Sequence, residues 1–72
     1  MPSEKLLRLP GVVKQTGLRR AAIYARIAEG SFPSPVKIGT RAVAWPESEV
    51  QAWIAERIVA ARSQRTDAAD AR

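Results

Sequence analysis

The stretch that decides the fold lies between Thr16 and Trp45, and it consists of two segments: Thr16-Gly17-Leu18-Arg19-Arg20-Ala21-Ala22-Ile23-Tyr24 and, after Gly30-Ser31-Phe32-Pro33, Val36-Lys37-Ile38-Gly39-Thr40-Arg41-Ala42-Val43-Ala44-Trp45. The first segment predicts the turn and second helix of a helix-turn-helix, and the second predicts a basic β-hairpin. A short helix that opens on two arginines and a ribbon with a cationic tip make a surface suited to duplex DNA. We therefore predict an α+β, mostly helical fold: a winged helix-turn-helix with a two-stranded hairpin wing and a C-terminal helix.

The residues before this stretch predict the first helix of the motif. Proline suits the first position of a helix, so we expect that helix over Pro10–Gln15, with a short strand before it around Leu7-Arg8-Leu9. Gly17 can adopt the positive φ that ends such a helix, and Leu18 then enters the core. The second helix is expected from about Arg19 to Glu29.

The hairpin has its own predicted register. Val36 and Ile38 alternate in phase with Val43 and Trp45 around a two-residue loop at Gly39-Thr40. This loop places Ile38 opposite Arg41 and Val36 opposite Val43, and it directs Lys37 away from the apolar face.

The third helix is predicted to begin at Pro46, with two carboxylates in its first turn. Its apolar stripe has helical spacing and is interrupted only by an arginine: Val50, Trp53, Ile54, Arg57, Ile58 and Ala61. We expect residues 1–62 to form one DNA-binding domain and residues 63–72 to be a frayed helix or disordered tail, because that end offers no large apolar group. Trp45 and Trp53 both fall on apolar faces, so we expect them to pack in the core.

The composition excludes several classes of protein. A chain of 72 residues with no cysteine and no histidine has room for one small domain and lacks disulfides, thiolate metal sites and the commonest general base. We expect neither an enzyme nor a cofactor or metal. The formal net charge is +5, and it is uneven: residues 1–46 hold eight basic and two acidic side chains, whereas the remainder is nearly neutral. The excess charge therefore lies in the segment expected to bind DNA.

The hydropathy of the chain predicts no membrane partner. No segment approaches the roughly 20 apolar residues that span a bilayer, and no run of signal-peptide type follows the N-terminus. We expect a cytoplasmic, nucleoid-associated protein.

The ordered set of short motifs resembles the AlpA family of phage and prophage regulators, over roughly Leu7 to Arg57. The motifs are Arg8-Leu9-Pro10, Thr16-Gly17-Leu18, Ile23-Tyr24, Glu29-Gly30, Phe32-Pro33, Pro35-Val36-Lys37-Ile38-Gly39, Arg41-Ala42-Val43, Trp45, Ser48-Glu49-Val50 and Ala52-Trp53-Ile54. The resemblance implies a small DNA-binding transcriptional regulator related to the winged-helix MerR regulators and phage excisionases. Family members usually have serine at the position of Arg19, so this chain lacks a helix cap worth about 1 kcal/mol and gains a charge.

Candidate contacts to DNA lie on the second helix and on the wing. Arginine can read a guanine edge with two hydrogen bonds, so Arg19 and Arg20 are the favoured base-reading residues, with phosphate binding as the alternative role. Arg41 at the wing tip is expected in the minor groove and Lys37 at a phosphate. Tyr24 is a secondary candidate, because a tyrosine beside two isoleucines more often packs with only its hydroxyl in water. The full predicted set is Arg19, Arg20, Ala21, Ala22, Tyr24, Lys37, Thr40 and Arg41.

Three functions remain open at this point. The first is a sequence-specific transcriptional regulator that binds double-stranded DNA, as a homodimer or a cooperative oligomer. The second is an excisionase-like factor that bends DNA for an integrase, which the alanine-rich recognition face (Ala21, Ala25 and Ala28) favours. The third is a protein-interaction adaptor whose positive field recruits an acidic partner.

Overall fold

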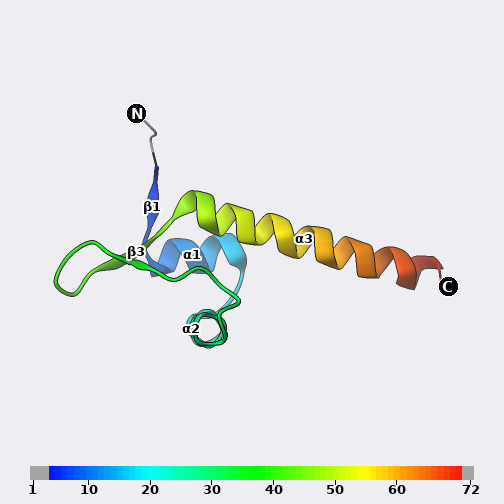
Figure 1. Ribbon diagram of the computed structural model, residues 1–72, viewed down its shortest axis with the longest axis horizontal. Coiled ribbons are helices and arrows are strands. Elements are labelled where there is room, and N and C mark those ends of the chain that lie inside the picture. The colour runs from blue at the N-terminus through cyan, green and yellow to red at the C-terminus, as the bar shows by residue number, and fades with distance from the viewer. Residues whose placement is uncertain (1–3, 71–72) are drawn as a thin grey trace.

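The computed structural model describes the backbone from Glu4 to Asp70 and the side chains from Glu4 to Ser63. Over these residues the elements follow in the order β1 (Leu6–Leu7), α1 (Leu9–Thr16), α2 (Arg20–Glu29), β2 (Val36–Lys37), β3 (Val43–Pro46) and α3 (Glu47–Asp70). Helix α1 lies beside the first turns of α3, α2 is seen end-on below it, and the β2–β3 wing projects to one side (Figure 1). The predicted α+β winged helix-turn-helix is the architecture observed.

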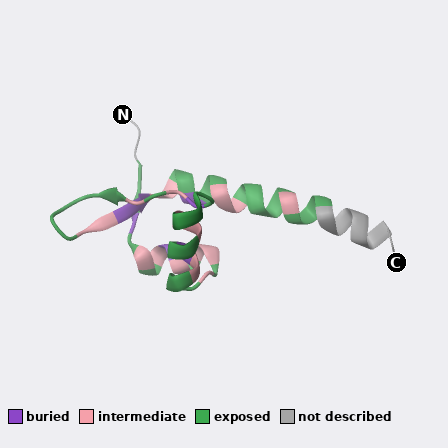
Figure 2. Ribbon diagram, turned by 60° about the horizontal axis from the view of Figure 1, so that its bottom comes forward, coloured by how far each residue is buried: buried purple, intermediate pink, exposed green. Residues whose placement is uncertain are grey.

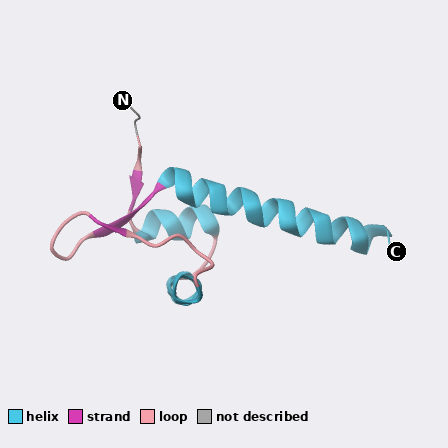
Figure 3. Ribbon diagram, viewed as in Figure 1, coloured by secondary structure: helices cyan, strands magenta, loops and turns pink. Residues whose placement is uncertain are grey.

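The sheet has three antiparallel strands in the order β1-β3-β2. The strand expected before the first helix exists, and it pairs with β3 through Leu6↔Pro46 and Leu7↔Trp45. It thereby adds a third strand to the hairpin (Figure 3). Strand β3 ends at Pro46 and α3 begins at Glu47, so no loop residue separates the wing from the third helix.

The predicted hairpin register is wrong by one residue. The structure pairs Val36 with Ala44 and Lys37 with Val43, and the Ile38 N–H donates to the Ala42 carbonyl, so Ile38 does not lie opposite Arg41. The tight two-residue loop expected here needs glycine at positive φ, and Gly39 is not among the described glycines with that conformation. The loop is longer than the predicted one, and each β2 side chain therefore lies on the face opposite to the one predicted.

The shifted register reverses the predicted faces of β2. Lys37 lies on the sheet face of Val43 and Trp45 but stays exposed. Val36 and Ile38, expected on the core face, lie on the opposite face with exposed fractions of 42% and 45%.

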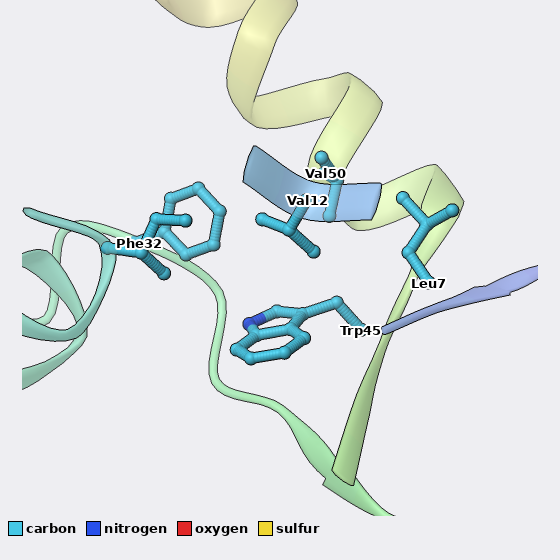
Figure 4. Close-up of a cluster of buried hydrophobic side chains, with 6 residues drawn as sticks. Leu7, Val12, Phe32, Trp45 and Val50 are labelled. Carbon is cyan, nitrogen blue, oxygen red and sulfur yellow. The ribbon is translucent and has the colours of Figure 1, made fainter. Parts of the chain in front are cut away.

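The core forms where the sheet meets all three helices. Its fully buried side chains are Trp45, Ile23, Val12 and Val50, and Leu7 and Phe32 complete the cluster. The Trp45 indole lies below Val12 and beside Phe32 (Figure 4). Its Nε1–H donates to the Pro33 carbonyl at 3.0 Å, which ties the connector after α2 to the sheet. The prediction that Trp45 is a core residue is confirmed, and Trp53 packs against the same cluster while partly exposed.

Two glycines end the first two helices. Gly17 has φ 75°, and its N–H donates to the Val13 carbonyl at 2.8 Å, as expected for the turn of the motif. Gly30 ends α2 with φ 81°. Leu18, directly after the first turn, packs against the core as predicted.

The hydrogen bonds described between α3 and the rest of the domain lie in the first turns of the helix. The Glu4 carboxylate accepts hydrogen bonds from the Ser48 N–H and hydroxyl, and these bonds lower the pKa of Glu4. Further along α3, Ile58 and Val59 are exposed. Figure 2 shows that the middle turns of this helix extend beyond the other elements and are largely exposed. The helical backbone continues to Asp70. The expected domain end at residue 62 stays a prediction, since side chains from residue 64 onward and residues 71–72 lie outside the described part.

Candidate nucleic-acid interface

One side of α2 is buried and the other is open. Ile23 is fully buried and Ile27 packs partly buried against the core, which fixes the rotation of the helix. The remaining faces expose Ala21, Ala25 and Ala28, as the helical spacing predicts. Ala22, a predicted contact residue, is half-buried and lies toward the flank of the helix. The exposed alanines leave the helix backbone within close reach of a ligand surface.

The first turn of α2 carries the two arginines. Arg19 is the N-cap residue, with extended φ −79° and ψ 160°, and its side chain makes no capping hydrogen bond. The structure therefore agrees with the prediction that this helix lacks a side-chain N-cap. Helix α2 begins at Arg20, one residue later than expected. Both guanidinium side chains are exposed. No acidic residue occurs in this first turn, so the positive end of the helix dipole is reinforced by two cations.

Arg20 and Tyr24 form a pair that the sequence analysis missed. The Arg20 guanidinium carbon lies 6.0 Å from the centroid of the Tyr24 ring, within cation–π range. Tyr24 in turn sets its ring edge-on to buried Trp45, with centroids 6.4 Å apart. Tyr24 as a whole residue is 41% exposed, which is more than expected for a core residue with only its hydroxyl in water. The i, i+4 spacing of the two residues was the signal that could have found the pair.

The wing presents the other predicted side chains. Lys37, Thr40 and Arg41 are all exposed, the last two in the loop between β2 and β3. The structure thus forms two cationic groups, one at the start of α2 and one on the wing. Trp45 connects them, because it lies in β3 and touches both the connector at Pro33 and the ring of Tyr24.

Arg26 faces away from this pair of cationic groups. Its guanidinium carbon lies 5.8 Å from the Trp53 ring centroid, on the flank of α2 that meets α3. Arg57 approaches the same ring at 5.8 Å, which agrees with an arginine that lays its stem over apolar surface. Trp53 also contacts Phe32 edge-on and donates from Nε1 to the Ser31 carbonyl at 2.6 Å. Stacking of this indole on nucleic-acid bases therefore competes with its contacts inside the protein.

A groove of about 540 Å³ lies between the connector and α3, away from the start of α2. It is lined by Gly30, Ser31, Phe32, Pro33, Glu49, Ala52, Trp53, Glu56 and Arg57. The Ser31 hydroxyl in this lining lies 3.3 Å from the Arg26 carbonyl oxygen and 3.4 Å from a Glu29 carboxylate oxygen, and both contacts are exposed. Within the described residues no group of acidic side chains is arranged to hold a metal ion, and no helix is long and apolar enough to cross a membrane.

Comparison with known proteins gives consistent matches. The family model of the prophage CP4-57 regulatory protein (AlpA) matches residues 5–58. Uncharacterized protein ORF88 of Enterobacteria phage P4 is 48% identical over 65 residues, which cover 90% of this chain and 73% of the relative. The DNA-binding transcriptional activator AlpA of Escherichia coli (strain K12) is 34% identical, over 74% of this chain and 84% of the relative. No solved structure matches the chain.

Proposed function

The chain belongs to the AlpA family of prophage regulatory proteins, and from that premise we propose that it is a sequence-specific regulator of transcription of a phage or prophage-like element. A phage-type DNA-binding regulator, and not an enzyme, is what the family establishes. Our proposal adds the geometry: α2 enters the major groove of double-stranded DNA, and the wing contacts the flanking backbone or minor groove.

The observation that carries the proposal is the exposed start of α2. Arg19 and Arg20 project from a helix whose first turn has no acidic residue, and the neighbouring Ala21 adds no bulk that would hold the helix away from a groove. Arg20 reads a guanine edge, and Tyr24 lies under its guanidinium. Ala22 on the flank sits against the groove wall.

The wing supplies the second set of contacts. Arg41 enters the minor groove, Lys37 neutralises a phosphate, and Thr40 donates its hydroxyl to the backbone. These contacts position the protein and carry little sequence information, whereas Arg20 carries most of it. A module of this size buries only about 600–1,000 Å², so we expect repeated sites, a homodimer or a DNA-bound partner for tight binding. The protein then works in the cytoplasm, at the nucleoid.

Selection of bound duplexes from a random library near physiological salt tests the proposal. We expect one motif to be enriched, Arg20→Ala to lose it, and Arg41→Ala to weaken binding to all sequences with a smaller salt dependence. Arg57→Ala is the matched control, because that arginine lies at Trp53 on the far side of α2. Enrichment that survives Arg20→Ala contradicts the assigned role.

An excisionase-like architectural factor is the second candidate, favoured by the alanines that occupy the open face of α2. It predicts binding without an enriched motif, together with a bend in the bound duplex and stimulation of an integrase. A protein-interaction adaptor predicts no binding to duplex DNA even at low salt.

A further inference from the structure

Tyr24 connects the exposed Arg20 side chain to the buried core. The Tyr24 ring meets the Trp45 indole edge-on, with centroids 6.4 Å apart and an angle of 65° between the ring planes. Trp45 is itself fully buried and donates a hydrogen bond to the Pro33 carbonyl, so both packing and a hydrogen bond fix the indole. The Arg20 guanidinium carbon lies 6.0 Å from the centroid of the Tyr24 ring. A long and flexible side chain therefore rests on a ring that the core holds in place.

The contact with Tyr24 leaves the hydrogen-bond donors of Arg20 available. A cation–π contact is made with the electron density of the ring and does not consume the N–H groups of a guanidinium. A carboxylate partner, in contrast, would occupy the same fork of donors that reads a guanine edge. The first turn of α2 holds no acidic residue, and Glu29 lies at the opposite end of the helix. Arg20 is thus attached to the protein in a way that is compatible with base reading.

Arg19 lacks this support, although it precedes Arg20 directly. It is the N-cap residue in extended conformation, and the residue four positions later is Ile23, which is fully buried. Among the residues whose side chains are described, no aromatic ring lies under the Arg19 guanidinium. Fixing an unsupported arginine in one geometry costs conformational entropy. The two arginines carry the same charge, but they differ in what it costs to order them.

From this difference we infer that Tyr24 is a positioning residue, which orders the Arg20 side chain before DNA binds and makes Arg20, rather than Arg19, the base-reading arginine. The inference rests on the proposed function, because it states how recognition by α2 becomes sequence-specific. Ordering one arginine in advance is worth about a three- to tenfold gain in affinity for the recognised sequence. Binding to other sequences gains little, since contacts to phosphates carry no sequence information and accept many side-chain geometries. Because Trp45 belongs to β3, the same ring also fixes Arg20 relative to the wing.

Two substitutions at Tyr24 separate the ring from its hydroxyl. Tyr24→Leu keeps an apolar side chain beside Trp45 but removes the ring, whereas Tyr24→Phe removes only the hydroxyl. Fluorescence anisotropy at one salt concentration compares a duplex that carries the selected motif with a duplex of the same bases in scrambled order. We expect Tyr24→Leu to lower affinity for the motif about three- to tenfold, and affinity for the scrambled duplex less than about twofold. Tyr24→Phe should keep the affinity for the motif within about twofold of the parent.

The same measurements can overturn the positioning role. Equal losses on the two duplexes would indicate general damage to the domain, which urea titration of each variant measures independently. A Tyr24→Phe variant that loses as much as Tyr24→Leu would assign the effect to a direct contact of the hydroxyl with DNA. Either result contradicts a role that depends on the ring and acts through Arg20.

Double-mutant cycles test whether Tyr24 acts through Arg20. In the Arg20→Ala background, Tyr24→Leu should change affinity for the motif by less than about twofold, because the side chain that it orders is absent. Arg19→Ala is the matched control background, in which the effect of Tyr24→Leu should keep its full size. A full effect in the Arg20→Ala background would overturn the positioning role and leave base reading by Arg20 intact. An Arg20→Ala variant with parental affinity for the motif would overturn the proposed function as well, so the two failures are distinguishable.

Nuclear magnetic resonance of the free protein gives a readout that needs no DNA. The order parameter of the Nε–H bond reports how far each arginine side chain is fixed on the fast timescale. We expect a higher value for Arg20 than for Arg19, and Tyr24→Leu should lower the Arg20 value to that of Arg19. Equal values for the two arginines in the parent protein would contradict the inference.

Discussion

Replacing Trp45 by phenylalanine removes the side chain that joins α2 to the wing. The indole is fully buried, and its Nε1–H satisfies the Pro33 carbonyl at 3.0 Å. Loss of that donor leaves a carbonyl without its partner, at a cost of about 1–3 kcal/mol. The smaller ring also leaves a void of roughly 35 Å³, which adds about 1 kcal/mol. We expect the free energy of unfolding to fall by about 2–4 kcal/mol.

This loss is large relative to the whole domain. A chain of this length is stabilised by about 4–11 kcal/mol, so the variant should remain folded at low temperature but unfold at much lower urea concentration. Urea titration followed by far-ultraviolet circular dichroism measures the change. Because Tyr24 rests edge-on against the same indole, DNA affinity should fall as well, even under conditions where the variant is folded.

Trp53→Phe is the matched control for this substitution. Its Nε1–H also donates to a carbonyl, that of Ser31, but at an exposed site where water can replace the indole. We expect it to cost less than half as much as the change at Trp45. Equal costs for the two variants, or a cost below about 1 kcal/mol at Trp45, would refute the assignment of the central role to the buried indole.

Three further changes probe single local features. Gly17→Ala should destabilise the domain by about 1–2 kcal/mol in urea titration, since a side chain there meets no neighbour but must adopt φ 75°; a neutral result would contradict the strain argument. Arg19→Ser should raise the free energy of unfolding by up to about 1 kcal/mol, because serine can supply the N-cap that α2 lacks, and it should weaken DNA binding. A decrease in both the free energy of unfolding and DNA affinity would contradict the absence of a cap in the parent protein. Glu4→Gln should remove a stabilisation that the parent retains above the ordinary pKa of 4.5 and loses as the pH falls through the lowered folded-state pKa. The two proteins should therefore differ at neutral pH and converge in acid, and a constant difference across the pH range would exclude the Ser48 contact as its source.

Most of the fold could be predicted because its signals are local. Gly17 and the apolar spacing of Ile23 and Ile27 define the first turn and the buried side of α2, and both behave as expected. The register of the wing could not be predicted, because it depends on the backbone conformation of Gly39, for which the sequence allows several turns. The pairing of Leu6 with Pro46 joins residues far apart in the chain, which no local pattern reveals.

The positions of the candidate residues could be predicted, but their contacts within the protein could not. Arginine next to the turn of a helix-turn-helix is visible in the sequence, so the exposed position of Arg19 and Arg20 at the start of α2 was expected. The position of Tyr24 under the Arg20 guanidinium depends on side-chain geometry and on the place of Trp45, which only the fold supplies. Whether these residues contact bases stays a prediction.

Because β3 passes directly into α3, the direction of the third helix is coupled to the direction of the wing. With no loop between Pro46 and Glu47 to absorb a change of direction, a tilt of the ribbon must tilt the helix axis with it. The 24 residues of α3 span about 36 Å, so a tilt of roughly 10° displaces the far end by about 6 Å. If Arg41 binds DNA as proposed, we expect a spectroscopic label on the far part of α3 to report a movement of the wing.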